Sequence, residues 1–390
     1  MRTQVGIVGA GPAGLMLSHL LHLRGIDSVV IERRSRDYVE RRIRAGVLEQ
    51  GSVDLLRDSG LGDRLTREGS RHEGIELRFA GEAYRVPMTE LTGRAITVYG
   101  QQEVVKDLIS ARIAAGGRIV FEVDDVGLHG LDTSTPVIRF RQGGHDVELH
   151  CDFVAGCDGS HGVSRGSVPG GVLTSYERAY PFAWLGVLAA AAPAVKELVY
   201  ANHERGFALY SLRSPEVSRL YLQVDPDEQL DEWPDERIWA ELRTRLETVP
   251  GWSVNAGPIL EKSITPMRSL VVEPMQWERL FLAGDAVHIV PPTGAKGMNL
   301  ALADVALLGD AFAAWYADGR DDLLRDYSRT ALRRVWRAQH FSWWMTSMLH
   351  RLDSHDPYEV QLQLSTLRYV ATSRSYATSL AENYVGLPEV

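Results

Sequence analysis

Cysteine is almost missing from this chain. Only Cys151 and Cys157 occur among its 390 residues, with neither Cys-x-x-Cys spacing nor a cluster of histidines beside them. A disulfide framework needs more cysteines, and a zinc site needs ligands at closer, repeated spacing. The sequence therefore predicts neither disulfides nor a metal site.

Long hydrophobic runs and a leader peptide are also lacking. The longest apolar stretch, residues 181–195, is too short to span a bilayer and contains Pro193. The chain begins with a predicted strand, without an apolar leader or a cleavage site. We therefore expect a cytoplasmic protein with no membrane partner.

Positive charge is in deficit. The chain has 42 lysines and arginines against 51 aspartates and glutamates, which gives a net charge of −9. Such a protein is a poor partner for nucleic acid or for an anionic membrane. The composition is otherwise globular, with 45% hydrophobic residues, and the length allows two or three domains.

Glycine, by contrast, is concentrated in the first strand-turn-helix segment. Gly9, Gly11 and Gly14 fit G-x-G-x-x-G, in which the first permits the sharp turn, the second lets the backbone approach a pyrophosphate and the third allows close helix packing. The following helix directs free N–H groups at the phosphates. Glu32 ends the second strand, where it can accept hydrogen bonds from a ribose. The segment predicts dinucleotide binding, NAD or FAD; a turn without a ligand is the alternative.

Six arginines fall in the twelve residues 33–44. A solvated helix face is one interpretation. Recognition of phosphates by guanidinium groups is the other, and either a nicotinamide dinucleotide phosphate or the FAD pyrophosphate could use it.

Two later buried strands end in an aspartate next to a glycine, at Asp158-Gly159 and Gly284-Asp285. In open α/β sheets this carboxyl edge is where ligands bind. The proline- and glycine-rich segment 291–299 then opens a helix whose free N–H groups can face an anion such as a reduced flavin. The alternatives are an ordinary turn at each strand end and a capped helix.

The strand-rich region around residues 207–221 places polar groups on one face. Alternation puts Ser211 and Arg213 on the same side, and a turn near Ser214 brings Arg219 and Tyr221 opposite them. A hydroxyl, a guanidinium and a phenol would suit a small carboxylate. An exposed polar hairpin face is the alternative.

The three motifs, in this order, resemble those of the class A flavoprotein aromatic hydroxylases. Longer segments, spread from one end of the chain to the other, make the resemblance more specific. They are similar to the hydroxybenzoate hydroxylases within that family. Gly162 stands where the wider family usually has Ser. The segments that carry the resemblance are residues 42–50, 157–162, 200–203, 291–299, 341–347 and 382–388.

The resemblance implies a mixed α/β (α+β) fold with three regions. Residues 1–175 would form a Rossmann-like FAD-binding domain, with residues 73–100 joining the sheet of the next domain. Residues 176–275 would form a β-rich substrate domain. Within it, the residues themselves predict short strands at 262–264 and 270–272. Residues 276–390 would supply an FAD-contacting strand and helix and then a C-terminal helical region. There we expect Tyr384 to be buried and Trp336, Trp343 and Trp344 to form core or dimer contacts.

The implied activity is hydroxylation of 4-hydroxybenzoate at C3, giving 3,4-dihydroxybenzoate, by an FAD enzyme that uses O2 and NAD(P)H through a flavin C4a-hydroperoxide. A homodimer is implied as well. Arg33, Arg34 and Tyr38 favour NADPH over NADH, whereas Glu40 adds a repelling charge. Another hydroxybenzoate remains open as substrate, as does a non-enzymatic flavin redox sensor.

The resemblance also assigns site residues. The substrate would contact Ser211, Arg213, Tyr221, Tyr200, Pro292 and Thr293. Catalysis would involve Tyr200, Tyr384, His72 and Pro292. FAD would contact Gly9, Gly11, Gly14, Glu32, Arg42, Arg44, Gln101, Asp158, Arg219, Asp285, Lys296, Gly297, Met298 and Asn299. NAD(P)H would contact Arg33, Arg34, Tyr38, Arg42, His161 and Arg268.

A proton path is chemically required for this activity. A free phenol ionises near pH ~10, so at neutral pH only about one molecule in a thousand is the reactive phenolate. Two tyrosines leading to a histidine could carry the proton out of a closed pocket. Closure matters because an oxygenated flavin exposed to water releases hydrogen peroxide.

Overall fold

Strand β1 (Val5–Val8) lies inside a six-stranded sheet of the computed structural model, which describes residues 1–42, 44, 46–352 and 356–386. The sheet order is β18-β19-β12-β1-β2-β8, and all pairs are parallel except β18 with β19. Its other strands are β2 (Ser28–Ile31), β8 (Arg118–Val120), β12 (Phe153–Gly156), β18 (Gln276–Trp277) and β19 (Leu280–Leu282). The parallel order brings the carboxyl ends of β1, β2, β12 and β19 to one edge, as a dinucleotide site requires.

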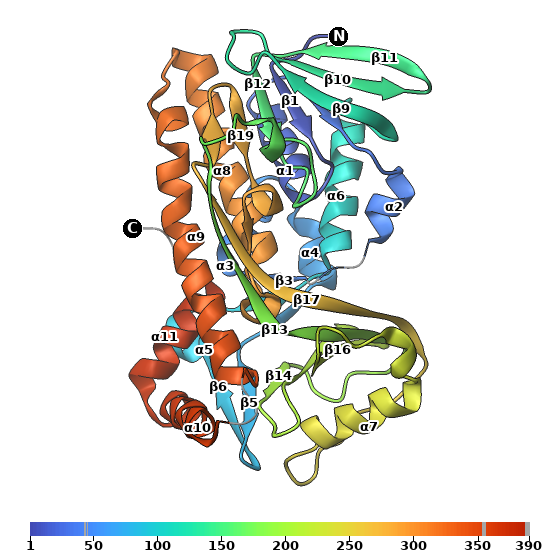
Figure 1. Ribbon diagram of the computed structural model, residues 1–390, viewed down its shortest axis with the longest axis vertical. Helices are drawn as coiled ribbons and strands as arrows, with labels where there is room; N and C mark the ends of the chain where they lie inside the picture. The colour runs from blue at the N-terminus through green and yellow to red at the C-terminus, as the bar shows by residue number, and fades with distance from the viewer. Residues whose placement is uncertain (43, 45, 353–355, 387–390) are drawn as a thin grey trace.

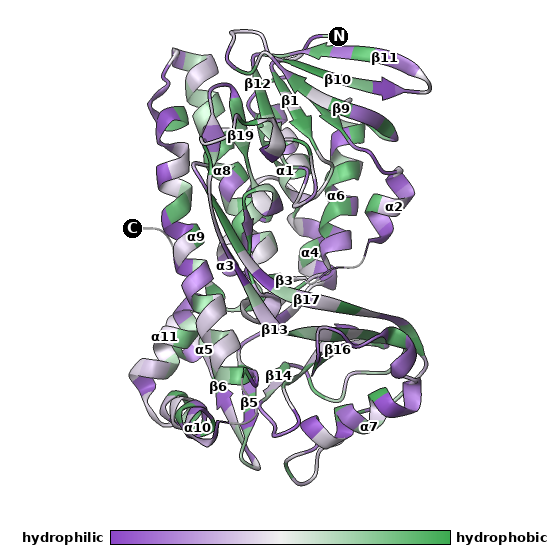
Figure 2. Ribbon diagram, in the orientation of Figure 1, coloured by the Kyte–Doolittle hydropathy of each residue, from purple (hydrophilic) through white to green (hydrophobic). Residues whose placement is uncertain are grey.

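Helices cover this sheet, and α8 runs beside the long α9 along one side of the molecule (Figure 1). The four inner strands, β1, β2, β12 and β19, are mostly apolar and buried throughout, in keeping with a parallel sheet covered on both faces (Figure 2). The helices of this part are α1 (Pro12–Leu23), α2 (Arg36–Arg41), α3 (Gln50–Asp58), α4 (Gly62–Glu68), α6 (Gln101–Ala114), α8 (Gly297–Asp318) and α9 (Asp322–Leu349).

A second, eight-stranded sheet lies below the first in Figure 1 and has the order β20-β17-β13-β16-β15-β14-β5-β6. Its strands are β5 (Ile75–Phe79), β6 (Glu82–Val86), β13 (Thr174–Ala189), β14 (Leu198–Ala201), β15 (Ala208–Ser214), β16 (Val217–Val224), β17 (Ile259–Glu273) and β20 (His288–Ile289). The early strands β5 and β6 thus join strands from the middle of the chain, whereas the last part of the expected segment 73–100 does not: residues 96–98 form a strand of a separate three-stranded sheet. The three-region division itself stays a prediction.

The expectation of two short strands at 262–264 and 270–272 was wrong. One continuous strand, β17, pairs antiparallel with β13 from Thr174 to Ala189. Pro266 does not interrupt it, because the register of β13 shifts between Ala179 and Ala183, next to the position that Pro266 faces. The two long strands run from the upper part of the molecule into the lower sheet (Figure 1).

The lower sheet is covered on both faces. Helix α7 packs on one side, and the C-terminal helices pack on the other with a core that includes Tyr200 and Tyr384. Tyr384 is buried, as expected, whereas Trp336 and Trp343 are exposed. The remaining elements are α5 (Met88–Thr92), α7 (Asp235–Leu246), α10 (Pro357–Thr372), α11 (Arg374–Val385), β3 (Val47–Leu48), β4 (Ser70–His72), β7 (Ile96–Val98), β9 (Val123–His129), β10 (Val137–Gln142), β11 (His145–His150) and the 3₁₀ turns η1 (Arg165–Ser167), η2 (Leu230–Glu232), η3 (Gly284–Ala286) and η4 (Pro292–Gly294).

Helix α8 is long and apolar enough to cross a membrane by length and composition, and half of its apolar window is buried inside the protein. It packs between α1 and α9. Core helices of globular proteins can be equally long and apolar.

Gly14→Ala should destabilise the fold. A Cβ at Gly14 would overlap the carbonyl oxygen of Gly9, whereas a Cβ at Gly11 would meet nothing within 4 Å. We expect a loss of about 1–3 kcal/mol for Gly14→Ala in urea unfolding, the usual cost of overpacking. Gly11→Ala is the matched control and should unfold at the wild-type midpoint; equal destabilisation of both variants would contradict the packing role of Gly14.

Candidate active site

A cavity of about 900 Å³ extends from the first glycine turn to the eight-stranded sheet. Most of the residues expected to bind a cofactor line it together, although they come from distant parts of the chain, and two residues expected to bind the substrate, Tyr221 and Pro292, line it as well. These lining residues are Gly9, Gly11, Glu32, Arg33, Arg34, Tyr38, Arg42, Arg44, Gln101, Asp158, His161, Arg219, Tyr221, Asp285, Pro292, Lys296, Gly297 and Met298. Ile43, Ala45, Leu387 and Pro388, which belong to the resembling segments, lie outside the described residues.

The glycine turn leaves room for a ligand on one side only. Gly9 has φ +105°, and a side chain there would overlap the backbone of Cys157. Glu32 is held in place because its two carboxylate oxygens accept hydrogen bonds from the backbone N–H groups of Ala10 (2.9 Å) and Arg34 (2.8 Å). Each oxygen keeps a lone pair for a further donor such as a ribose hydroxyl.

Asp158 presents a free carboxylate oxygen. Its Oδ2 accepts hydrogen bonds from the N–H and the hydroxyl of Ser164, both 2.9 Å long, while the buried Oδ1 has no hydrogen-bond partner among the described residues. Burial raises the pKa of this carboxyl group. A Cβ at Gly162 would overlap the Asp158 carboxylate, which is a steric reason for glycine instead of serine at that position.

The turn that carries Asp285 is supported by two residues that sequence reasoning missed. Asp304 on α8 accepts a hydrogen bond from the N–H of Gly284 (2.9 Å) and pairs with buried His288 at 2.6 Å. Burial opposes the charge on His288, but Asp304 outweighs it and raises the pKa of the imidazole. Nothing in the local sequence signalled this pair, because the partners meet only through tertiary packing.

Lys296 and Asn299 hold the start of α8 in place. The Lys296 ammonium is buried, forms an ion pair with Glu49 and donates to the backbone carbonyl of Tyr384 (3.1 Å). Burial lowers the pKa of Lys296 despite the carboxylate. Asn299 was expected at the flavin ring, but its amide accepts from the N–H of Glu49 and donates to the carbonyls of Val47 and Ala295. Its side chain therefore braces the backbone beside the cavity.

The expected polar hairpin face is formed by β15 and β16, where Ser211 lies opposite Arg219 and Leu209 lies opposite Tyr221. Arg213 donates to the carbonyl of Leu212 (3.1 Å) and to the Ser211 hydroxyl (3.4 Å), and its buried Nε has no hydrogen-bond partner in the described part of the chain. Burial raises the pKa of Tyr221, but the charges of Arg219 and Arg213 outweigh it and lower that pKa overall. This face favours an anion.

Tyr200 and Tyr384 are brought together, and their buried hydroxyls form a hydrogen bond. The Tyr200 hydroxyl also lies 3.4 Å from the carbonyl oxygen of Thr293, next to Pro292 at the cavity wall. Burial raises the pKa of both phenols. The pair is therefore neutral and able to pass a proton along.

His72 is not joined directly to the tyrosine pair. The ring is 1% exposed, and both of its nitrogens lack hydrogen-bond partners among the residues described. Burial is the main cause that lowers the pKa of His72 to about 4, which keeps the imidazole neutral.

Five of the six residues expected to contact NAD(P)H lie along the cavity wall, and the guanidinium of Arg34 lies over the Tyr38 ring at 5.0 Å. Arg268 does not join them. Its guanidinium instead lies 3.5 Å from the carboxylate of Glu177, on the paired strand β13.

Comparison with known proteins gives consistent matches. The FAD binding domain family matches residues 2–342. The p-hydroxybenzoate hydroxylase of Acinetobacter baylyi is 48% identical over 389 residues, covering 100% of this chain and 96% of that protein. The rifampicin monooxygenase of Rhodococcus hoagii is 24% identical over 315 residues, covering 80% of this chain and 64% of that protein.

Solved structures agree on the fold. The p-nitrophenol 4-monooxygenase of Pseudomonas putida DLL-E4 superposes with a TM-score of 0.82 at 17% identity, covering 100% of both chains. Aklavinone-11 hydroxylase, solved with FAD and aklavinone, gives a TM-score of 0.75 at 22% identity, covering 89% of this chain and 69% of that one.

His72→Gln should weaken the acid dependence of stability. In the folded protein His72 stays neutral down to about pH 4, whereas in the unfolded chain it takes up a proton near pH ~6.5. Its contribution is therefore complete above pH ~6.5 and is lost as the pH falls toward about 4. Between pH 7.5 and pH 5, urea unfolding should show wild type losing about 2 kcal/mol more than the variant.

The exposed His145 provides the control for this measurement. His145→Gln should follow the wild-type pH dependence. If His72→Gln also follows it, His72 is not buried as a neutral ring.

Proposed function

The chain belongs to the class A flavoprotein aromatic hydroxylases, and from this premise we propose that it converts 4-hydroxybenzoate and O2 to 3,4-dihydroxybenzoate with NAD(P)H as reductant. It is an FAD-dependent monooxygenase. The choice of substrate rests chiefly on one observation: the Arg213 guanidinium, whose buried Nε has no hydrogen-bond partner among the described residues, and the buried Tyr200–Tyr384 pair both lie close to Tyr221. A para-hydroxy acid carries a carboxylate for the first and a phenol for the second.

The residues of the cavity fit FAD. The turn at Gly9 and Gly11 and the first N–H groups of α1 would hold the pyrophosphate, and Glu32 would hold the adenosine ribose. The free Oδ1 of Asp158 needs a hydroxyl donor, and the ribityl chain offers several. When bound, FAD accepts hydride from NAD(P)H and supplies the activated oxygen.

Arg213, Ser211 and Tyr221 would bind the substrate carboxylate. The guanidinium of Arg213 is already fixed by two hydrogen bonds, so little rotamer freedom remains to be lost on binding. A planar guanidinium can also meet both carboxylate oxygens, which a lysine cannot do.

Tyr200 and Tyr384 would move the phenol proton. The substrate hydroxyl would donate to Tyr200 or to the carbonyl of Pro292, and the phenol pair would pass the proton toward His72. Neither ring nitrogen of His72 has a hydrogen-bond partner among the described residues, so bridging water between it and Tyr384 would complete the path.

NADPH is the proposed reductant, because Arg33, Arg34 and Tyr38 line the mouth of the cavity and could bind a 2′-phosphate. Anaerobic flavin reduction with NADPH and with NADH in the presence of 4-hydroxybenzoate measures this preference. Because NAD(P)H is a cytosolic reductant, we propose a cytoplasmic location.

A homodimer is proposed through the C-terminal helices. Trp336 and Trp343 on α9 and Tyr369 on α10 are exposed, an arrangement more typical of an interface than of a free surface. Light scattering should give twice the chain mass of 43.3 kDa; a monomer at micromolar concentration would refute the dimer.

The substrate is tested by a panel of 4-hydroxybenzoate, 3-hydroxybenzoate and protocatechuate, with product measured beside NADPH loss. With 4-hydroxybenzoate we expect one molecule of 3,4-dihydroxybenzoate for each NADPH consumed. The other two acids should not give this stoichiometric yield of product. Stoichiometric product from another acid would replace the proposed substrate. Flavin reduction without any hydroxylated product would favour a redox sensor.

Tyr200→Phe should retain FAD and substrate binding but lose hydroxylation. The variant removes the hydroxyl that would accept the substrate proton and leaves the ring volume almost unchanged. We expect the ratio of product to NADPH consumed to fall at least about tenfold, the lower range of general-base effects, with hydrogen peroxide making up the balance. Tyr210→Phe, at a buried tyrosine on the opposite face of the sheet, is the control and should stay coupled.

A further inference from the structure

The last turn of α9 and its C-cap residue His350 contact two side chains at or next to the cavity. At one side, the Thr346 hydroxyl donates to the Thr293 hydroxyl (3.0 Å). At the other, His350 is 2.7 Å from the indole nitrogen of Trp184 on β13. The carbonyl of Thr293 adjoins the Tyr200 hydroxyl, and Trp184 lines the cavity, so this turn fixes the position of both residues.

The chemistry of the His350 contact defines its tautomer. An indole N–H can only donate, so Nε2 of His350 must be the acceptor. Nδ1 then carries the proton and donates to the carbonyl oxygen of Thr346 at 3.1 Å. His350 is fully buried, and this burial lowers its pKa to about 3. The imidazole is therefore a fixed neutral acceptor rather than a proton carrier.

Trp184 connects His350 to the pocket by direct packing. Its ring packs against Tyr221 with 4.8 Å between centroids and stacks on Phe207 at 5.3 Å. His350 stacks on Phe182 at 4.4 Å between centroids and packs against Phe207 in a tilted arrangement at 4.1 Å. A rotation of the indole would displace Tyr221, which belongs to the proposed carboxylate site.

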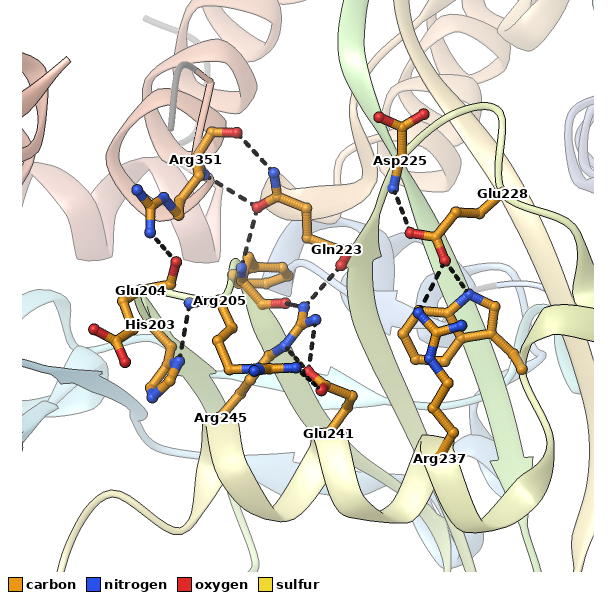
Figure 3. A network of polar contacts seen from close by, with 12 residues as sticks. His203, Glu204, Arg205, Gln223, Asp225, Glu228, Arg237, Glu241, Arg245 and Arg351 are labelled. Carbon is orange, nitrogen blue, oxygen red and sulfur yellow. Dashed lines mark hydrogen bonds and ion pairs between the residues drawn. The ribbon is translucent and has the colours of Figure 1, made fainter. Parts of the chain in front are cut away.

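The end of α9 is itself tied to the lower sheet. The Gln223 amide on β16 donates to the carbonyl of Arg351 (2.7 Å) and accepts from its N–H (3.0 Å), as Figure 3 shows. Buried Arg245 in turn donates to the carbonyl of Gln223 at 2.7 Å. On the other side, Asn202 donates to the carbonyl of Leu349 (3.1 Å). The acceptor nitrogen of His350 therefore has a fixed position relative to the sheet.

From these contacts we propose that His350 is a positioning residue for the aromatic substrate, acting through the indole of Trp184. This inference rests on the proposed function for its substrate, but the contact itself does not. His350 touches neither the cavity nor the carboxylate site. Its role is to keep Trp184, and with it Tyr221, in the orientation that the substrate meets.

Two variants test the roles of the two ring nitrogens of His350 separately. His350→Gln places an amide oxygen near Nε2, where it can accept from Trp184. His350→Asn places an amide near Nδ1, where it can donate to Thr346 but cannot reach the indole. Both remove the aromatic ring, so they share any loss of stacking. Substrate Kd from the flavin absorbance change, product formed for each NADPH and thermal unfolding are measured for both holoenzymes.

We expect His350→Asn to raise the Kd of 4-hydroxybenzoate roughly tenfold and to increase peroxide release, because it leaves a buried indole N–H without an acceptor. His350→Gln should stay within about twofold of wild type. Equal effects of both variants on Kd and on coupling, or no effect of His350→Asn, would overturn the proposal. Trp184→Phe, which lacks the N–H, should make His350→Asn and His350→Gln equivalent.

The indole resonance of Trp184 in protein labelled with ¹⁵N-tryptophan gives a readout that needs no substrate, and it is assigned by its absence in Trp184→Phe. Its N–H proton should lose the downfield shift of a hydrogen-bonded indole in His350→Asn and retain a downfield shift in His350→Gln; a resonance that stays downfield in His350→Asn would contradict the contact. If wild type makes no 3,4-dihydroxybenzoate, the proposed function fails. The positioning role is then decided by this resonance and by the Kd of whichever hydroxybenzoate perturbs the flavin spectrum.

Discussion

The buried ion cluster around Glu49 is the interaction on which the site depends. Its carboxylate pairs with Lys296 at the start of α8 and with Arg334 on α9, the latter at 2.6 Å. Lys296 also bonds to backbone carbonyls of Asn383 and Tyr384 on α11. One carboxylate thus joins an early segment, the cavity wall and the C-terminal helix that carries a proposed catalytic phenol. Such a cluster adds little net stability over apolar packing, but losing one partner leaves a buried charge and is costly. We therefore regard it as a determinant of geometry.

The sequence predicted the parts of the fold whose signals are local. The glycine turn at Gly9 and the hairpin pairing of Ser211 with Arg219 follow from spacing and alternation, and the structure has both. The continuous strand β17 could not be predicted from spacing and alternation. Its middle is polar and contains Pro266, and it remains a strand only because β13 pairs with it across a register shift.

The residues of the site likewise fall into those with a local sequence signal and those without one. Residues that face the cavity from a motif, such as Asp158 and Asp285, were identified, whereas their supports were not. Asp304, His288 and His350 belong to patterns that look like ordinary helix or strand sequence, and their roles arise from contacts across long sequence separations. Asn299 shows the converse: the motif marked it as a ligand residue, yet its amide is engaged by three backbone groups.

The groups left without partners explain why the site should bind an anion. Arginine stays charged in a protein interior, so the buried Nε of Arg213, which has no hydrogen-bond partner in the described part of the chain, carries a desolvation cost in the absence of a ligand. A carboxylate would remove that cost and would gain charge-assisted hydrogen bonds that water in the same place cannot match. The histidines around the pocket, His72 and His350, are kept neutral by burial and offer no competing positive charge. Since the ligand binds only the folded protein, occupation of the Arg213 site by substrate should stabilise the whole chain.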